Sequence, residues 1–144
     1  MGFMKIKKIC KKGIVLTLAG AISMASFGTN AMAASTVTGN LNGIVCYGSI
    51  STNNTSAYAT TTFGRSNSTI KTSATVYYWW KDKYYKTKVS NSNTAGGAGA
   101  TAKKKIGGAD VVGGKGTHFV KYDSYKWGTE KTTIGCIPSN AITK

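Results

Sequence analysis

Side chains that could do acid–base or nucleophilic chemistry are scarce in this sequence of 144 residues. There is one histidine, His118, and the four acidic residues are scattered at positions 82, 110, 123 and 130. A hydrolytic triad needs a nucleophile, a base and a group that orients the base, and a glycosidase needs two carboxylates facing one cleft. Alternation places His118 on one strand face with Val120 and Tyr122, which is typical of a packed structural histidine. We therefore expect a protein without catalytic residues that is not an enzyme.

Sites for metals or other cofactors are not indicated either. No cluster of His, Cys, Asp and Glu in the sequence has the spacing of metal ligands. The run GGKGT at 113–117 resembles part of a phosphate-binding loop, but the GxxxxGK[ST] spacing is missing. Gly116 stands where that loop has the Ser or Thr that binds magnesium. The sequence therefore predicts no metal and no cofactor.

The unusual stretch is an aromatic and basic run between positions 77 and 88. As a hairpin it would present a mixed outer face of aromatic rings and lysines: Tyr77, Trp79, Tyr84, Lys86 and Lys88. Aromatic rings stack on sugars or bases, and lysines hold phosphate or carboxylate groups. Alternatively, Tyr77 and Trp79 pack in a core and the lysines protect an edge strand; the exposure of Trp79 distinguishes the two. A second basic cluster consists of Lys103, Lys104 and Lys105.

The charge of the chain is strongly one-sided, and part of it belongs to an export signal. The net charge is +15, from 19 basic and four acidic residues. Lysines in the first 13 residues precede an apolar run at 14–28 and the small-residue motif Ala31-Met32-Ala33, which is the order of a cleaved signal peptide. A membrane-spanning helix would need about 20 apolar residues. We expect a signal peptide at 1–33 and one cationic domain at 34–144 with a net charge of +10.

The domain at 34–144 is rich in Ser, Thr, Val, Ile and Tyr, and turn residues punctuate it. Strands are predicted at 43–51, 56–63, 69–80, 84–90, 98–104, 117–122 and 131–137. These short strands favour an all-β fold, a small antiparallel β-sandwich that is immunoglobulin-like or related. The glycine-rich segment 94–116 is predicted to hold a weak strand, the basic cluster and a mobile loop.

The hairpin over 69–90 has a predicted register. Even positions from Ile70 to Trp80 form the better core face by alternation. A two-residue turn at Asp82-Lys83 would set Trp80 opposite Tyr85, so that core residues meet core residues. That turn has no glycine, so a longer, looser turn is the alternative.

Two cysteines, Cys46 and Cys136, remain after the expected cleavage. An even number in an exported chain predicts a disulfide, which would close a loop of about 90 residues and contribute about 4–5 kcal/mol to stability. A metal or redox pair is the weaker alternative, because there is no CxxC and only one histidine.

The layout of a signal peptide followed by one small cationic β-domain resembles small exported proteins of Gram-positive bacteria. Some bacteriocins of the lactococcin 972 type are similar in layout and composition. This leaves two alternative functions. One is a secreted or wall-associated module that binds an anionic wall polymer, a glycan or a membrane surface; the other is a secreted antibacterial protein. Neither requires a specific nucleic acid.

Overall fold

The protein is an all-β structure of two sheets. The computed structural model describes residues 34–144, so the predicted signal peptide at 1–33 lies outside the described residues. The strands are β1 (Ser35–Leu41), β2 (Ile44–Thr52), β3 (Ser56–Phe63), β4 (Thr69–Trp80), β5 (Lys83–Asn93), β6 (Gly96–Lys103), β7 (Asp110–Tyr122), β8 (Tyr125–Gly135) and β9 (Ile142–Thr143). Within 34–144 there is no helix with the length and apolar character needed to span a membrane.

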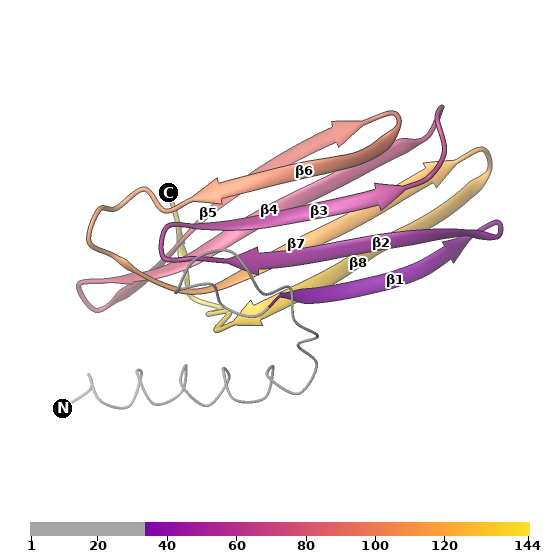
Figure 1. Cartoon of the computed structure of the whole chain (residues 1–144). Coiled ribbons are helices and arrows are strands. Elements are labelled where there is room, and N and C mark those ends of the chain that lie inside the picture. Colours follow the sequence, from indigo (N-terminus) through magenta and orange to yellow (C-terminus); the bar gives the residue numbers. More distant parts are fainter. Residues whose placement is uncertain (1–33) are drawn as a thin grey trace.

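The two sheets face each other as layers (Figure 1). One, called sheet A, has the strand order β1-β2-β3-β6, and the other, sheet B, has the order β8-β7-β4-β5-β9. Neighbouring strands are antiparallel except that the short β9 runs parallel to β5. This arrangement agrees with the predicted β-sandwich. The topology differs from that of an immunoglobulin constant domain. Here β1, β2 and β3 all belong to sheet A, whereas the third strand of the immunoglobulin domain belongs to the second sheet.

The core lies between the sheets and follows the predicted alternation on β4. Ile70, Ala74, Val76 and Tyr78 are completely buried, which confirms the even positions as the core face. Facing them, β3 and β6 contribute mainly alanines: Ala57, Ala59, Ala98, Ala100 and Ala102. Small residues on sheet A therefore leave room for the large ring of Tyr78 on sheet B.

The predicted turn between β4 and β5 is wrong by one residue. Lys81 and Asp82 form the turn, and Trp80 pairs with Lys83 rather than with Tyr85. Both turn residues have positive φ, 42° and 66°, as a two-residue hairpin of the primed type requires. The error shifts each partner by two residues, so every side chain stays on its predicted face. It does place an aromatic pair on the outer face, because Trp79 pairs with Tyr84.

The glycine-rich segment is more regular than predicted. Instead of a weak strand and a loop over 94–116, β6 occupies Gly96–Lys103 and β7 already begins at Asp110. A side chain at Gly114 would place its Cβ 2.6 Å from the Thr52 side chain on the opposite sheet. Glycine in this strand therefore reflects close approach of the sheets and not a flexible loop.

The predicted disulfide between Cys46 and Cys136 is wrong. Cys46 is a free, fully buried thiol that packs in one cluster with Val120 and Trp127, and burial raises its pKa. Cys136 lies beside a different part of β7, because its amide donates a hydrogen bond to the Val112 carbonyl. Val112 precedes Val120, the neighbour of Cys46, by eight residues along β7. That separation corresponds to about 26 Å of strand, whereas a disulfide requires Cα atoms within about 7 Å.

Candidate functional site

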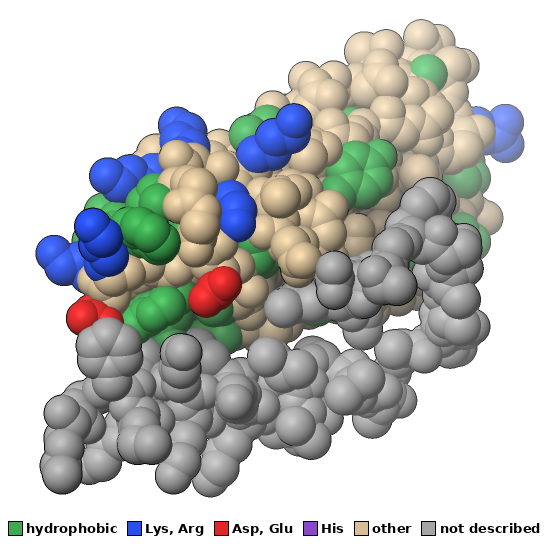
Figure 2. Space-filling model, turned by 60° about the vertical axis from the view of Figure 1, so that its left-hand side comes forward, with side chains coloured by type: hydrophobic (Ala, Val, Ile, Leu, Met, Phe, Trp, Pro, Cys, Tyr) green, Lys and Arg blue, Asp and Glu red, His purple; other side chains and the backbone are tan. Residues whose placement is uncertain are grey.

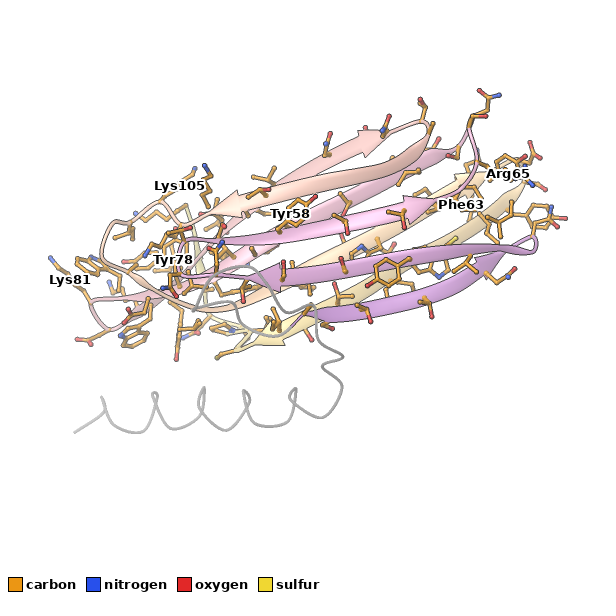
Figure 3. All side chains as sticks on the ribbon, viewed as in Figure 1. Tyr58, Phe63, Arg65, Tyr78, Lys81 and Lys105 are labelled. Atoms are coloured by element: carbon orange, nitrogen blue, oxygen red, sulfur yellow. The ribbon has the colours of Figure 1, made fainter. Side chains whose placement is uncertain are left out.

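One end of the sandwich concentrates positive charge, and we call it the lysine-rich end. Its members are Lys81, Lys83, Lys86, Lys103, Lys104, Lys105 and Lys144. Figure 3 shows Lys81 and Lys105 at this end and Arg65 at the opposite one. Two acidic residues, Asp82 in the turn and Asp110 opposite Trp79, also lie here, so lysines outnumber acids by five. Figure 2 shows the basic side chains gathered here around hydrophobic ones.

Separate segments of the chain meet to form the lysine-rich end. The Lys105 amide donates to the hydroxyl of Tyr78 over 3.4 Å, which fixes the 103–105 cluster beside the β4–β5 hairpin. The Lys104 amide donates to the Thr55 carbonyl, and its Nζ donates to the Ala109 carbonyl. At the C-terminus, the Lys144 amide donates to the Lys86 carbonyl. The 103–105 cluster and the lysines at the turn end of the β4–β5 hairpin, which are separate in the sequence, thus form one surface.

Aromatic rings support these lysines. The Lys81 Nζ lies 5.6 Å from the ring centre of Trp80, and the Lys144 Nζ lies 5.3 Å from that of Tyr85. Trp80 is itself braced by the β6–β7 connection, because a Cβ on Gly108 would be 3.2 Å from its ring. An ammonium group and the aromatic face beside it attract each other by about 0.5–1 kcal/mol at exposed sites. The rings therefore restrict where these two ammonium groups lie.

The predicted aromatic platform is only partly accessible. Tyr77 and Tyr84 retain 6% and 9% of their exposure, and burial raises the pKa of both hydroxyls. Trp79 is half-buried and meets Tyr84 edge to face, with ring centres 4.7 Å apart. For Tyr77 and Tyr84 this favours the alternative in which the aromatic side chains serve packing. Among the predicted lysines, Lys88, Lys103 and Lys105 are exposed, and Lys86 and Lys104 are half-buried.

Several members of this surface were not predicted from the sequence. Alternation predicts Trp80 and Tyr85 on the core face, and they do lie on it, but at its outer limit, where both are half-exposed. Lys144 cannot be predicted as a member, because nothing in the sequence places the C-terminus beside β5, where it lies in the structure. The one signal in the sequence for this surface is that a lysine, Lys81, directly follows Trp80.

Apart from the lysine-rich end, a concave feature lies on the outer face of sheet B. It is a groove of about 590 Å³ lined by Lys71, Thr72, Ser73, Lys88, Ser90, Asn91, Ser92, Thr117, Phe119 and Thr129. Lys88, predicted to act with Lys86, belongs to this groove. The predicted register, with Trp80 opposite Tyr85, would set Lys88 opposite Tyr77. In the structure Lys88 pairs with Thr75.

His118 is a structural residue in the interior. Its ring is completely buried, with Nδ1 2.9 Å from Thr61 Oγ1 on sheet A and Nε2 2.8 Å from Thr132 Oγ1 on sheet B. Burial lowers its pKa from 6.5 to about 4, with the Thr60 backbone acting in the opposite direction. Both ring nitrogens are engaged and no solvent reaches them, so His118 is not placed to act on a substrate. Among residues 34–144, no three His, Cys, Asp or Glu side chains cluster as metal ligands would.

Comparison with known proteins adds no family or homologue. No protein-family model, no curated protein and no solved structure matches the chain. Functional interpretation therefore depends on the chemistry of the surfaces described above.

Proposed function

We propose that the protein is an exported cationic β-sandwich that binds anionic polymers of a bacterial cell surface through its lysine-rich end. The observation that supports this most directly is the convergence of seven lysines from three segments of the chain around Trp80 and Tyr85. Like charges held close together repel one another, so such a cluster is stabilised when it binds a polyanion. The binding requires no catalytic group, which fits a protein that is not an enzyme.

The chemistry of the lysine-rich end suits a polymer of phosphate or carboxylate groups more than a single small anion. Its cations come from the β4–β5 turn, the β6–β7 connection and the C-terminus, so they are spread over a surface and do not surround one point. Lysine acts as a point charge on a flexible stem and tolerates irregular spacing of anions. Trp80 and Tyr85, half-exposed among them, offer apolar contact to sugar rings.

The proposed location outside the cell rests on the signal-peptide pattern at 1–33. In a Gram-positive bacterium the anionic partners there are wall polymers, glycans and lipid headgroups. A net charge of +10 on the domain at 34–144 favours retention at such a surface at low salt and release at high salt.

The second candidate function is that of a secreted antibacterial protein. It is favoured by the layout of a signal-peptide pattern followed by a small cationic β-domain, which resembles that of bacteriocins of the lactococcin 972 type, and it would use the same cationic end against the envelope of a competitor. Growth inhibition of related Gram-positive bacteria by the purified protein, together with a neighbouring immunity or transporter gene, would favour this candidate over a wall-binding module.

The proposal is tested by comparing two charge-matched triple variants. Lys81→Ala, Lys83→Ala and Lys105→Ala remove three exposed cations from the lysine-rich end, and Arg65→Ala, Lys121→Ala and Lys126→Ala remove three exposed cations near the opposite end. Binding to purified wall polymer is measured across a salt series. We expect the first variant to reduce the slope of log K against log salt by roughly 2–3, since each phosphate contact contributes about 0.7–0.9 to such slopes in nucleic acids.

The control variant should keep a slope close to that of the wild type. Equal losses in both variants would mean that net charge alone drives binding, and the proposed site would be wrong. Vesicles with anionic headgroups and uncharged glycan, tested in parallel, identify which class of surface is preferred.

A further inference from the structure

The groove on the outer face of sheet B arises from a row of small hydroxyl residues. Ser73 on β4 pairs with Ser90 on β5 and with Thr117 on β7, so three short side chains stand next to each other across three strands. Longer side chains, Lys71, Phe119 and Lys88, rise on either side of this row. The result is a depression on the outer face of sheet B, and its volume of about 590 Å³ falls in the range of small-molecule sites, about 300–1,000 Å³.

The floor of the groove is polar and ordered. Ser73 is only 4% exposed, and its hydroxyl lies 2.5 Å from that of Thr117. The exposed amide and hydroxyl side chains of Asn91 and Ser92 continue the polar lining on β5. Hydroxyl and amide groups both donate and accept hydrogen bonds, which is the pattern that a polyhydroxylated ligand needs.

Two ammonium groups bracket the groove. Lys71 lies at one end, with its Nζ 5.9 Å from the ring centre of Phe119, and Lys88 lies on the other side, opposite Thr75. Lys71 and Thr75 are four residues apart on β4, so the two lysines are separated by about 14 Å along the strands. No acidic side chain is among the residues that line the groove. Its field therefore favours an anionic ligand.

We propose that this groove binds one sugar-sized unit that carries an anionic group, either phosphate or carboxylate. The hydroxyl groups of the unit hydrogen-bond to Ser90 and Thr117, which flank the buried Ser73, Phe119 contacts its apolar edge, and Lys71 or Lys88 pairs with the anion. This inference deepens the proposed function and rests on it for the source of the ligand, because it names the repeating unit of the polymer. Single-stranded nucleic acid is the less suitable ligand, since it requires open aromatic faces on which bases stack, and the Phe119 ring is half-buried beside Lys71.

The experiment follows backbone amide shifts by NMR while the protein is titrated with glucose 6-phosphate, glucuronic acid, glucose, inorganic phosphate or a short oligonucleotide. We expect the two anionic sugars to shift amides around Ser73, Ser90 and Thr117, and glucose and phosphate to bind more weakly. Whichever anionic sugar binds more tightly identifies the acidic group. Stronger binding of the oligonucleotide, or shifts outside the groove alone, would overturn the proposal.

Two variants and a control test the groove itself. Lys88→Met removes one ammonium group, and Ser90→Tyr fills the groove at an exposed position without changing charge. Lys88→Met should weaken binding of the anionic sugar roughly tenfold or more, as loss of one hydrogen bond to a charged group would. Ser90→Tyr should weaken it at least as much, because the tyrosine ring occupies the space of the ligand. Lys126→Met, outside the groove and exposed, is the matched charge control and should bind as the wild type does. Equal weakening in all three variants would overturn the proposal.

The triple variant at the lysine-rich end separates this inference from the proposed function. If that variant loses the wall polymer but keeps the sugar, both proposals are supported. If the wild type binds the sugar in the groove but not the polymer, the proposed function is wrong and the groove remains a site. If it binds the polymer but no anionic sugar, the groove proposal alone is wrong.

Discussion

The stability of this protein should fall as the pH decreases below 6.5, because His118 is buried in its neutral form. In the unfolded chain a histidine takes up a proton near pH 6.5, whereas burial lowers the pKa of His118 to about 4 in the folded state. Between these values the unfolded state binds more protons than the folded state. Stability therefore rises with pH through this window and is lost as the pH falls through it.

The size of the effect follows from the two pKa values. Each pKa unit corresponds to about 1.4 kcal/mol, so the free energy of unfolding should fall by about 3 kcal/mol between pH 7 and pH 4. Small domains are stable by about 5–15 kcal/mol in total, so the loss should be easy to measure. The loss of stability comes from the interior of the sandwich, because the His118 ring lies between the hydroxyls of Thr61 and Thr132 on opposite sheets.

The assay is urea denaturation followed by tryptophan fluorescence at several pH values from 7 to 4. The comparison is with His118→Gln, which cannot take up a proton but keeps a donor and an acceptor in the same place. The variant should be less stable than the wild type at pH 7 and should lack the loss of about 3 kcal/mol that the histidine causes.

Two results would refute this reasoning. One is an equal pH dependence in the wild type and in His118→Gln, which would assign the effect to the carboxylates. The other is a direct NMR titration of the His118 ring that gives a pKa near 6.5. The NMR titration uses the wild type alone, so it remains decisive even if the variant does not fold.

Two further predictions concern stability. Replacing the turn residues by Lys81→Asn and Asp82→Gly should raise the free energy of unfolding by about 1 kcal/mol, because both positions have positive φ and this pair adopts it readily; unchanged stability in urea would contradict the turn. Cys46→Ala should cost less than about 2 kcal/mol, far below the 4–5 kcal/mol of a long-range disulfide, because the thiol is free. The companion measurement is the rate at which a thiol reagent labels Cys46. Labelling should be slow until the protein is unfolded, and rapid labelling of the folded protein would contradict the burial of Cys46.

The parts of the fold that the sequence predicts well are those with clear alternation. The bounds of β3 and β4 agree with the predicted 56–63 and 69–80, and the completely buried residues of β4 (Ile70, Ala74, Val76 and Tyr78) all belong to the predicted even set. Strand periodicity reports which face is buried, and it does so from local information alone. The turn between β4 and β5 was less predictable, because neither Lys81 nor Asp82 carries the glycine signal of a primed turn.

The parts that the sequence did not predict depend on contacts between distant segments. Glycine and alanine in β6 and β7 have low strand propensity, and their place in strands reflects the close approach of the opposite sheet. The error at Cys46 and Cys136 has the same origin, since a count of cysteines carries no information on the distance between them. For the lysine-rich end, the sequence identified most of the lysines, but the contact of Lys105 with Tyr78 is a property of the folded chain.

The order of the strands has a consequence for how fast the protein folds. The β4–β7 pair joins Thr69 to Lys121, and the β3–β6 pair joins Ser56 to Lys103, so both pairings bring together positions about 50 residues apart in the chain and enclose the β4–β5 hairpin. Chains dominated by such distant pairings fold in milliseconds to seconds, whereas a hairpin closed by two residues forms in about 1–10 μs. We therefore expect the β4–β5 hairpin to form early and the two sheets to close slowly around it. For a chain that is proposed to leave the cell, slow closure of the sheets would lengthen the time during which the polypeptide is still unfolded and able to cross a membrane.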